Sequence, residues 1–270
     1  MTDAPSPLAT PLPWNLVAEG YAQDVMPLFE VFARDALVRL GGAQGRTLAD
    51  VACGPGTLAL LAARQGATVR AIDFSPPMIA LLRARAQAES LTVAAEVGDG
   101  MALPWADASV DAAASMFGLM FFPDRDRGLR ELLRVLRPGG RAVVTSWVPA
   151  ARIPLLETLF RLLGELSGAP ASPPRVLPLT TAADCAREMS AAGFVDVEVA
   201  EVSASDRAPT TAALVESMVR SNAPVALLRE RSGAAWPAMQ QRLYDGLEAA
   251  FGPGPHTLTM IANVATGTRA

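Results

Sequence analysis

The sequence predicts an α/β fold in which a parallel sheet carries helices on both faces. Between residues 47 and 147, short apolar segments typical of strands alternate with segments whose apolar residues recur at helical spacing. A Gly-x-Gly turn joins the first strand to the first helix. Such alternation is typical of a parallel sheet, because parallel strands need long crossovers that are usually helices.

The first half of the chain contains most of these elements. We expect strands at "TLADVA", "TVRAID", "LTVAAEV", "SVDAAASM" and "RAVVTSW". Helices are expected in "TLALLAARQG", from Pro76 to about Ala88, and from about Arg125 to Leu136. Ahead of the first strand, apolar residues recur at helical spacing from Trp14 to Leu40, where Pro27 marks a break or a new helix start.

After these strands the rhythm changes. A helical piece and a Pro/Ser-rich loop occupy 150–178, and a helix from Ala182 to Ala192 leads into the strand "FVDVEVAEV". Residues 208–251 are predicted to be helical, with breaks at Pro224 and Pro237, and "TLTMIANVATGT" alternates like a last strand. Without an internal repeat or a clear linker, one sheet domain with helical insertions is favoured over two domains.

Composition excludes several classes of protein. Of 270 residues, 51% are hydrophobic and 19% charged, which is typical of a soluble globular protein, and the net charge of -4 does not favour nucleic acid as a partner. The two cysteines, Cys53 and Cys185, belong to no metal-binding pattern. Residues 1–13 are Pro-rich, without the apolar region of a signal peptide, and no apolar run could span a membrane. We therefore expect a cytoplasmic protein with no metal and no membrane insertion.

The glycine turn in "LADVACGPGTLALLAARQG" is ambiguous by itself. Residues 54–59 fit the dinucleotide fingerprint G-x-G-x-x-G/A, and Asp73 follows near the expected offset for a ribose ligand. An NAD-dependent oxidoreductase is therefore one alternative. Asp50 argues against it, because a carboxylate is poorly placed beside a pyrophosphate but suits a cationic ligand with an ammonium group.

Three further segments favour another cofactor. In "VRAIDFSPPMIALLRARA", Asp73 ends a strand, where it could bind both hydroxyls of a ribose. In "VGDGMALPWADASVDAA", Asp99 could accept a hydrogen bond from an adenine amino group, and "LRELLRVLRPGGRAVVTSW" is a helix that runs into a strand. Here the chain resembles the class I S-adenosylmethionine-dependent methyltransferases, especially the bacterial small-molecule group with the ubiquinone and menaquinone C-methyltransferases. The resemblance covers about Asn15 to Trp147 and is thin beyond, apart from "AGFVDVEVAEV".

The resemblance implies a Rossmann-like, seven-stranded, mostly parallel sheet with an antiparallel last strand and with helical insertions that form a lid. It divides the chain into a flexible arm (1–13) and one methyltransferase domain (14–270). Within that domain it implies an N-terminal helical lid (14–45), a cofactor-binding core (46–147), two helical substrate covers (148–180 and 205–253), and two segments that complete the sheet (181–204 and 254–270).

The cofactor implied is S-adenosylmethionine, with S-adenosylhomocysteine as product. By position, the methionine and ribose part of the cofactor would be lined by Asp50, Ala52, Gly54 and Gly56, and the ribose hydroxyls would be bound by Asp73. The adenine ring would have Phe74 and Met78 against its face and Asp99, Gly100 and Met101 at its edge. The methyl path would be bordered by Ser115 and Met116, and the N-terminal helix would contribute Tyr21. The family usually has Gly where Ala52 stands; Ala permits the turn provided that φ stays negative.

Several residues of these segments also have a purely structural interpretation. Asp73 could cap the following helix, and Asp99 could be an ordinary turn residue. Cys53 is interpreted as a small buried filler rather than a nucleophile. Tyr21 and Trp14 could both be core aromatics on an amphipathic helix.

His256, the sole histidine, is a candidate general base. If the last strand is antiparallel, its first residues would lie at the end of the sheet where ligands gather. No dedicated acid–base pair is evident in the sequence, so we expect methyl transfer by in-line displacement driven mainly by proximity.

The acceptor is predicted to be small and largely hydrophobic, such as an aromatic, polyketide or quinone-like molecule. Arg152, Arg175 and Arg220 could hold an acidic group on it. The alternatives are a protein that binds the cofactor or its product without transfer and, less favoured, the oxidoreductase. The sequence leaves open whether O, N or C is methylated, and whether the chain is a monomer or a homodimer.

Overall fold

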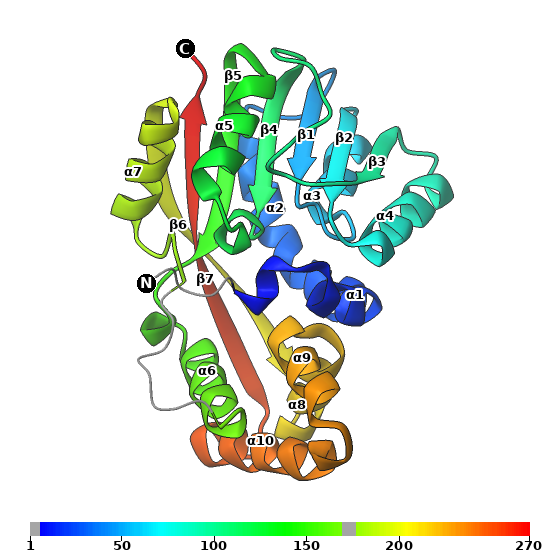
Figure 1. Cartoon of the computed structure of the whole chain (residues 1–270), viewed down its shortest axis with the longest axis vertical. Helices are drawn as coiled ribbons and strands as arrows, with labels where there is room; N and C mark the ends of the chain where they lie inside the picture. The colour runs from blue at the N-terminus through cyan, green and yellow to red at the C-terminus, as the bar shows by residue number, and fades with distance from the viewer. Residues whose placement is uncertain (1–5, 169–176) are drawn as a thin grey trace.

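A seven-stranded sheet forms the centre of the molecule (Figure 1), which a computed structural model describes over residues 6–168 and 177–270. The strand order is β3-β2-β1-β4-β5-β7-β6. The strands are β1 (Thr47–Val51), β2 (Thr68–Asp73), β3 (Val93–Val97), β4 (Val110–Met116), β5 (Leu136–Trp147), β6 (Val195–Ala208) and β7 (His256–Thr268). Strands β1 to β5 are parallel, and β7 is antiparallel to both of its neighbours. The predicted fold class is confirmed.

Helices cover both faces of this sheet and its lower end in Figure 1. They are α1 (Pro11–Gly20), α2 (Met26–Arg39), α3 (Thr57–Arg64), α4 (Pro76–Ala88), α5 (Arg125–Val135), α6 (Pro154–Leu166), α7 (Ala182–Ala192), α8 (Thr211–Ser221), α9 (Ala223–Ser232) and α10 (Trp236–Phe251). A π-helical turn, η2 (Tyr21–Val25), links α1 to α2, and a 3-10 turn, η3 (Leu119–Phe121), follows β4. Helices α4 and α7 have the predicted bounds.

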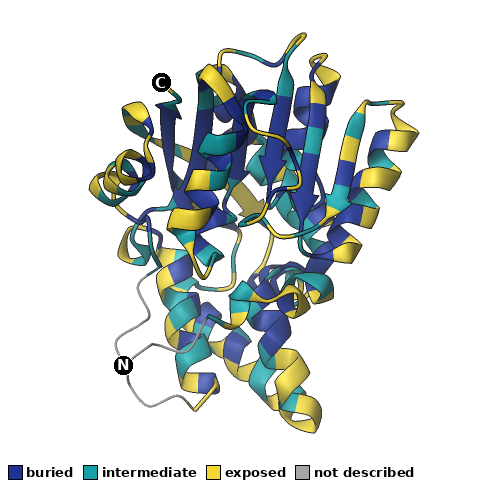
Figure 2. Cartoon of the chain, turned by 45° about the horizontal axis from the view of Figure 1, so that its top comes forward, coloured by how far each residue is buried: buried dark blue, intermediate teal, exposed yellow. Residues whose placement is uncertain are grey.

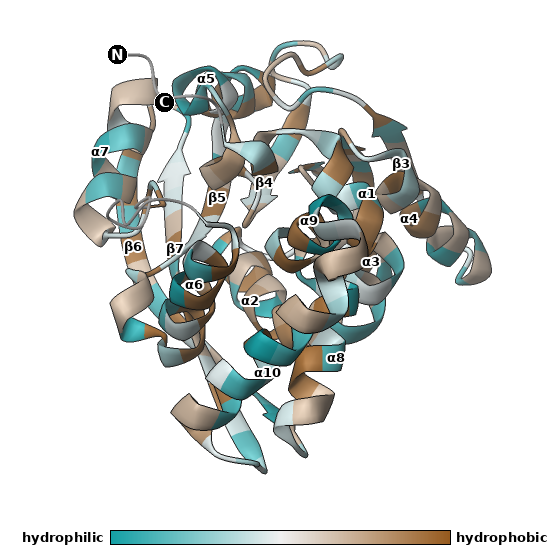
Figure 3. Cartoon of the chain, turned by 60° about the horizontal axis from the view of Figure 1, so that its bottom comes forward, coloured by the Kyte–Doolittle hydropathy of each residue, from teal (hydrophilic) through white to brown (hydrophobic). Residues whose placement is uncertain are grey.

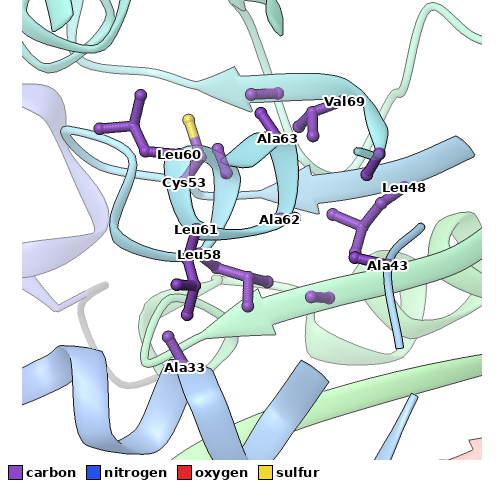
Figure 4. Packing of buried hydrophobic residues seen from close by; sticks show 14 of the residues in the cluster. Ala33, Ala43, Leu48, Cys53, Leu58, Leu60, Leu61, Ala62, Ala63 and Val69 are labelled. Atoms are coloured by element: carbon purple, nitrogen blue, oxygen red, sulfur yellow. The ribbon is translucent and has the colours of Figure 1, made fainter. Parts of the chain in front are cut away.

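The alternation of side chains along β1 decides which residues face which layer. Leu48 belongs to the cluster under α2 and α3, whereas Ala49 and Val51 belong to the cluster under α5 and α7. Asp50 therefore points to the same side as Leu48, because side chains two apart share a face. The buried strands appear as the dark centre of Figure 2, and Figure 4 shows how Leu58 and Leu61 of α3 pack into the first cluster.

Strands β6 and β7 extend well past β5 as a two-stranded ribbon. Ala262 pairs with Trp147 at the end of β5, and the ribbon continues to the pair Ala208 and His256. Helices α6, α8 and α10 pack around this extension in a separate apolar cluster (Figures 1 and 3). Residues 205–208, predicted as part of a helical cover, are strand because β7 supplies their hydrogen-bonding partners.

Residues 6–13 of the predicted flexible arm form ordered turns and the start of a helix. Residues 1–5 lie outside the described residues, but helix α1 begins at Pro11, three positions before Trp14. Proline suits the first turn of a helix, where its missing N–H is not needed. The indole Nε1 of Trp14 donates to the Leu8 carbonyl at 2.9 Å and fixes the segment ahead of the helix.

Candidate functional site

The turn after β1 has the left-handed backbone that its glycines permit. Gly54 has φ +53° and Gly56 φ +95°, and a Cβ on Gly56 would lie 2.3 Å from Leu82 Cδ1. Ala52 also has a positive φ, of +57°, so the expectation of a negative φ there was wrong. The turn requires this conformation, and Ala52 adopts it despite the steric cost of its Cβ.

Asp73 at the end of β2 closes the turn. Its Oδ2 accepts from the Gly54 N–H at 2.8 Å and its Oδ1 from the Ser75 N–H at 2.9 Å. Burial raises the pKa of Asp73 to about 6, opposed by these two amides. The side chain that caps α4 is that of Ser75, which accepts from Met78 N, so the helix-cap interpretation of Asp73 does not hold.

Asp50 is the most unusual group in the site. Its side chain is buried (1% exposed), and neither carboxylate oxygen has a hydrogen-bonding partner among the described residues. Burial raises its pKa to about 7, with the Ala59 amide opposing and the Asp73 charge adding to the shift. An unpaired buried carboxyl is costly, so it marks a place where a ligand can supply the missing partner.

A small cavity of about 30 Å³ lies beside Asp50. Five predicted residues line it: Tyr21, Asp50, Ala52, Gly54 and Met116. Such a volume holds about one water, whereas pockets for larger ligands measure roughly 300–1,000 Å³. The structure is therefore in a closed conformation, and a larger ligand can enter only if the covering residues move.

Helix α1 and the turn η2 lie over this cavity and form an N-terminal lid. The Ser75 hydroxyl donates to Asn15 Oδ1 at 2.7 Å, and Trp14 packs on Phe121 with ring centres 5.2 Å apart. Asp24 of η2 accepts from Ser217 at 3.0 Å and from Arg220 at 2.9 Å, both on α8. The N-terminal lid is thus attached on one side to the sheet and on the other to the C-terminal helices.

Tyr21 reaches the cavity from η2. Burial and the nearby Asp73 charge raise the pKa of its phenol, so the hydroxyl stays protonated. It can donate a hydrogen bond to a ligand but cannot take up a proton. Cys53 is also at the cavity, where burial, Asp50 and Asp73 raise the pKa of its thiol. Cys53 packs among the leucines of α3, as the filler interpretation expects (Figure 4).

Several predicted residues lie away from the cavity. Asp99 is exposed, and its Oδ1 accepts from Met101 N at 2.8 Å, which is the ordinary turn geometry. A Cβ on Gly100 would lie 2.5 Å from the ring of Phe122. Met78 is buried in the cluster beneath α1. Phe74 and Ser115 do not line the cavity either, and Ser115 Oγ is buried without a partner among the described residues.

His256 is not part of this site. It lies six residues beyond Ala262 on the ribbon, or ~20 Å past the end of β5 at the usual rise of a strand. The Thr211 hydroxyl donates to the Gly252 carbonyl at 2.6 Å and therefore accepts from His256 Nε2 at 2.8 Å. The predicted general base therefore lies outside this site, because β6 and β7 together extend far beyond β5.

An aromatic cluster beside the cavity was missed by sequence reasoning. Phe29 lines the cavity, and Phe117 stacks on Trp147 with ring centres 4.2 Å apart. Phe117 directly follows β4 and has φ +58°, which is rare for a bulky residue. The aromatic-rich segment "MFGLMFF" after that strand was the available signal.

Charged groups offer little for an acidic acceptor. Arg152 forms an ion pair with Glu201 and Arg220 with Asp24, and Arg175 lies outside the described residues. Among residues 6–168 and 177–270, no cluster of three metal-binding side chains occurs. Within the same ranges, no helix is both long and apolar enough to cross a membrane.

Comparison with known proteins identifies the sheet core. Residues 49–144 match the family described as "Methyltransferase domain". This segment is a class I methyltransferase domain. Demethylmenaquinone methyltransferase of Deinococcus radiodurans is 44% identical over 77 residues (28% of this chain, 32% of that protein), and that of Corynebacterium glutamicum is 34% identical over 123 residues (41% and 54%). The matches thus span between a third and about half of these relatives.

The solved structures extend the likeness to most of the chain. The [4+2]-cyclase SpnF shares 25% identity and superposes with a TM-score of 0.57, covering 89% of this chain and 82% of that one. The methyltransferase domain therefore lies within a fold that most of this chain shares with SpnF, whereas the match to the methyltransferase family covers residues 49–144 only.

Proposed function

We propose that this chain is an S-adenosylmethionine-dependent methyltransferase acting on a small, largely hydrophobic acceptor. The observation that carries the proposal is the buried, unpartnered Asp50 carboxyl beside the glycine turn. A ligand bearing an ammonium group supplies the hydrogen-bond donors and the positive charge that this carboxylate lacks. A pyrophosphate would instead place negative charge against it.

The residues at hand fit the rest of such a cofactor. Gly54 and Gly56 let the backbone come close to a ligand. Each oxygen of Asp73 accepts one amide hydrogen bond and keeps a second lone pair for a ribose hydroxyl. Tyr21 and Met116 complete the wall. We keep the adenine roles of Phe74, Asp99 and Met101 as part of the proposal for the open conformation.

S-adenosylmethionine supplies, when bound, a methyl group on a positive sulfur that an acceptor atom can displace in line. The chain's own contribution is to hold the partners in line and to exclude water, through the apolar side chains of Phe29 and Met116. Tyr21 can orient the acceptor as a hydrogen-bond donor. With His256 remote, this arrangement favours an acceptor whose nucleophilic atom reaches the site already deprotonated.

A second candidate is a protein that binds the cofactor without methyl transfer. The cavity of about 30 Å³ admits neither cofactor nor acceptor unless the covering residues move, so it does not separate the two candidates. The likeness to SpnF, named as a cyclase, adds that this fold serves other reactions.

Calorimetric titration with S-adenosylmethionine and S-adenosylhomocysteine is the deciding experiment. We expect the parent to bind both, and Asp73→Ala to lose at least about tenfold in affinity, since two buried amides lose their acceptor. Asp126→Ala, an exposed residue of α5, is the control. Binding of NAD in place of either ligand overturns the proposal. Binding without transfer of a labelled methyl to a panel of phenols and quinols favours the second candidate.

A further inference from the structure

The Asp50 carboxyl is enclosed without a partner. Its side chain is 1% exposed, and within residues 6–168 and 177–270 neither of its oxygens has a hydrogen-bonding partner. The cavity of about 30 Å³ beside it holds about one water, which is too little to hydrate a carboxylate. A buried carboxylate that has neither hydration nor a partner is unstable, so the group takes up a proton instead.

The side chains around Asp50 supply no positive charge. None of the described residues that line the cavity is basic. The glycine turn contributes Cys53 and η2 contributes Tyr21, and both are weak acids that stay protonated, because burial raises their pKa. Helices α2 and α3 and strand β4 contribute uncharged side chains: Phe29, Ala33, Thr57, Leu58 and Met116.

Asp73, at the end of β2, acts in the same direction. Burial raises the pKa of Asp50 to about 7, and the Asp73 charge adds to the shift, with only the Ala59 amide opposing it. Asp73 accepts hydrogen bonds from the amides of Gly54 and Ser75, and its pKa is about 6. Of the two carboxyls, Asp50 therefore holds a proton to the higher pH.

The arginines on these elements do not supply the missing charge. They lie outside the cavity lining and have other partners: Arg34 with Glu30, Arg39 with Asp35, Arg64 with Glu89, and Arg70 with Ser109. The cation that Asp50 can pair with must therefore arrive with the ligand.

We propose that Asp50 carries a proton in the closed, ligand-free conformation and exchanges it for the ammonium group of the cofactor. The carboxyl O–H bond breaks, the proton passes to water while the N-terminal lid is open, and the ammonium group keeps its own protons and binds the carboxylate. The inference rests on the proposed function and deepens it, because it makes Asp50 the residue that selects ligands with an ammonium group and couples their binding to pH.

The exchange fixes the direction of the pH dependence. At pH values below about 7, the pKa of Asp50 in the ligand-free protein, binding must remove the proton, so affinity falls as the pH falls. At higher pH the carboxylate is already formed, and the affinity levels off. A nucleoside without an ammonium group leaves Asp50 protonated and should not follow this dependence.

Two ligands and one variant test the exchange. S-adenosylhomocysteine carries the ammonium group, whereas 5′-methylthioadenosine has the same adenine and ribose without it and reports what Asp73 contributes. Asp50→Asn keeps the shape of the side chain but cannot titrate. Calorimetry between pH 5.5 and 7.5, in buffers of different ionisation enthalpy, measures the affinity and the number of protons released.

We expect S-adenosylhomocysteine to release about one proton more than 5′-methylthioadenosine at pH 6. Between pH 5.5 and 7.5, its affinity should rise about twentyfold relative to that of 5′-methylthioadenosine. Asp50→Asn should bind S-adenosylhomocysteine about tenfold more weakly than the parent at pH 7.5, without the extra proton and without the rise. If 5′-methylthioadenosine binds too weakly to measure, this variant gives the same comparison.

Equal proton release with the two ligands, or by the parent and Asp50→Asn, overturns the inference and leaves the methyltransferase proposal standing. An S-adenosylhomocysteine affinity that stays constant over this pH range does the same. A parent that does not bind S-adenosylhomocysteine at any of these pH values overturns the proposed function itself.

Discussion

The sheet core and the C-terminal cover are stabilised in different ways. The core, over β1 to β5, keeps buried polar groups at its carboxyl end: Asp50, Asp73 and Ser115. The C-terminal cover is the cluster that α6, α8 and α10 form on the β6–β7 ribbon. Its buried members are apolar, such as Leu159, Leu243 and Leu247. The core therefore carries groups that cost stability unless a ligand compensates them, whereas the C-terminal cover is stabilised by apolar packing and by paired polar groups such as Thr211 and His256.

This difference also explains where the comparisons end. The family match covers residues 49–144, which include Asp50, Asp73 and the glycine turn between them. An apolar interface tolerates many combinations of residues if its volume is kept. The C-terminal cover can therefore change its sequence without losing its fold.

The largest expected effect is on the stability of the C-terminal cover. Leu243→Ala, at a fully buried position, should lower the free energy of unfolding by about 2–5 kcal/mol, because it leaves a cavity between α10 and its neighbours. Affinity for S-adenosylhomocysteine should be unchanged at temperatures where the variant is folded. Urea denaturation and calorimetry measure the two quantities. Leu12→Ala, at a half-exposed position, is the control; a loss of affinity equal to that of Asp73→Ala would contradict the separation of roles.

Alanine in place of a glycine of the turn should lower the free energy of unfolding. Gly56→Ala should cost about 2–4 kcal/mol, since the new Cβ would lie 2.3 Å from Leu82 Cδ1 at a positive φ. Gly54→Ala is the matched control: its φ is also positive, but nothing lies within 4 Å, so about 1 kcal/mol is expected. Urea denaturation gives the difference. Equal losses in the two variants would show that overlap with Leu82 contributes nothing.

The buried acid predicts a dependence on pH. The pKa of Asp50 is raised from 3.8 to about 7, so the folded state binds more protons than the unfolded state between these values. Stability must then fall as pH rises from about 4 to about 7, by at most about 1.4 kcal/mol per pH unit from this group. Asp73, with a pKa of about 6, adds a similar fall that ends near pH 6.

Asp50→Asn isolates the first of these two contributions. Urea denaturation at pH 5, 6, 7 and 8 should show a shallower fall between pH 6 and 7 in this variant than in the parent. The same fall in both proteins would mean that Asp50 does not titrate in this range.

The smallest expected effect concerns the attachment of η2, the turn of the N-terminal lid, to α8. Asp24→Asn weakens the contact with Arg220, and its cost should be about 0.5–1 kcal/mol, because Arg220 is half-exposed. The association rate of S-adenosylhomocysteine should rise a few-fold, since the closed conformation loses a contact. Stopped-flow fluorescence measures the rate. Asp35→Asn removes an ion pair within α2 and should leave the rate unchanged; an equal change in both variants would show that the Asp24 contact does not govern opening.

Local sequence determined the sheet core. Strand and helix periods, the glycine turn and the acids at the ends of β1 and β2 could be predicted, because each depends on residues close together in the chain. The bounds of α4 follow from Ser75 and two prolines, and the place of Asp73 follows from the strand that it ends.

Only the tertiary structure decided the rest, because it depends on residues far apart in sequence. The long ribbon of β6 and β7 removed His256 from the site, and contacts of α1 with Ser75 and of η2 with α8 closed the cavity. Phe117, with its left-handed backbone, is held by a hydrogen bond to Thr145 and by its stack on Trp147, which no local pattern in the sequence encodes.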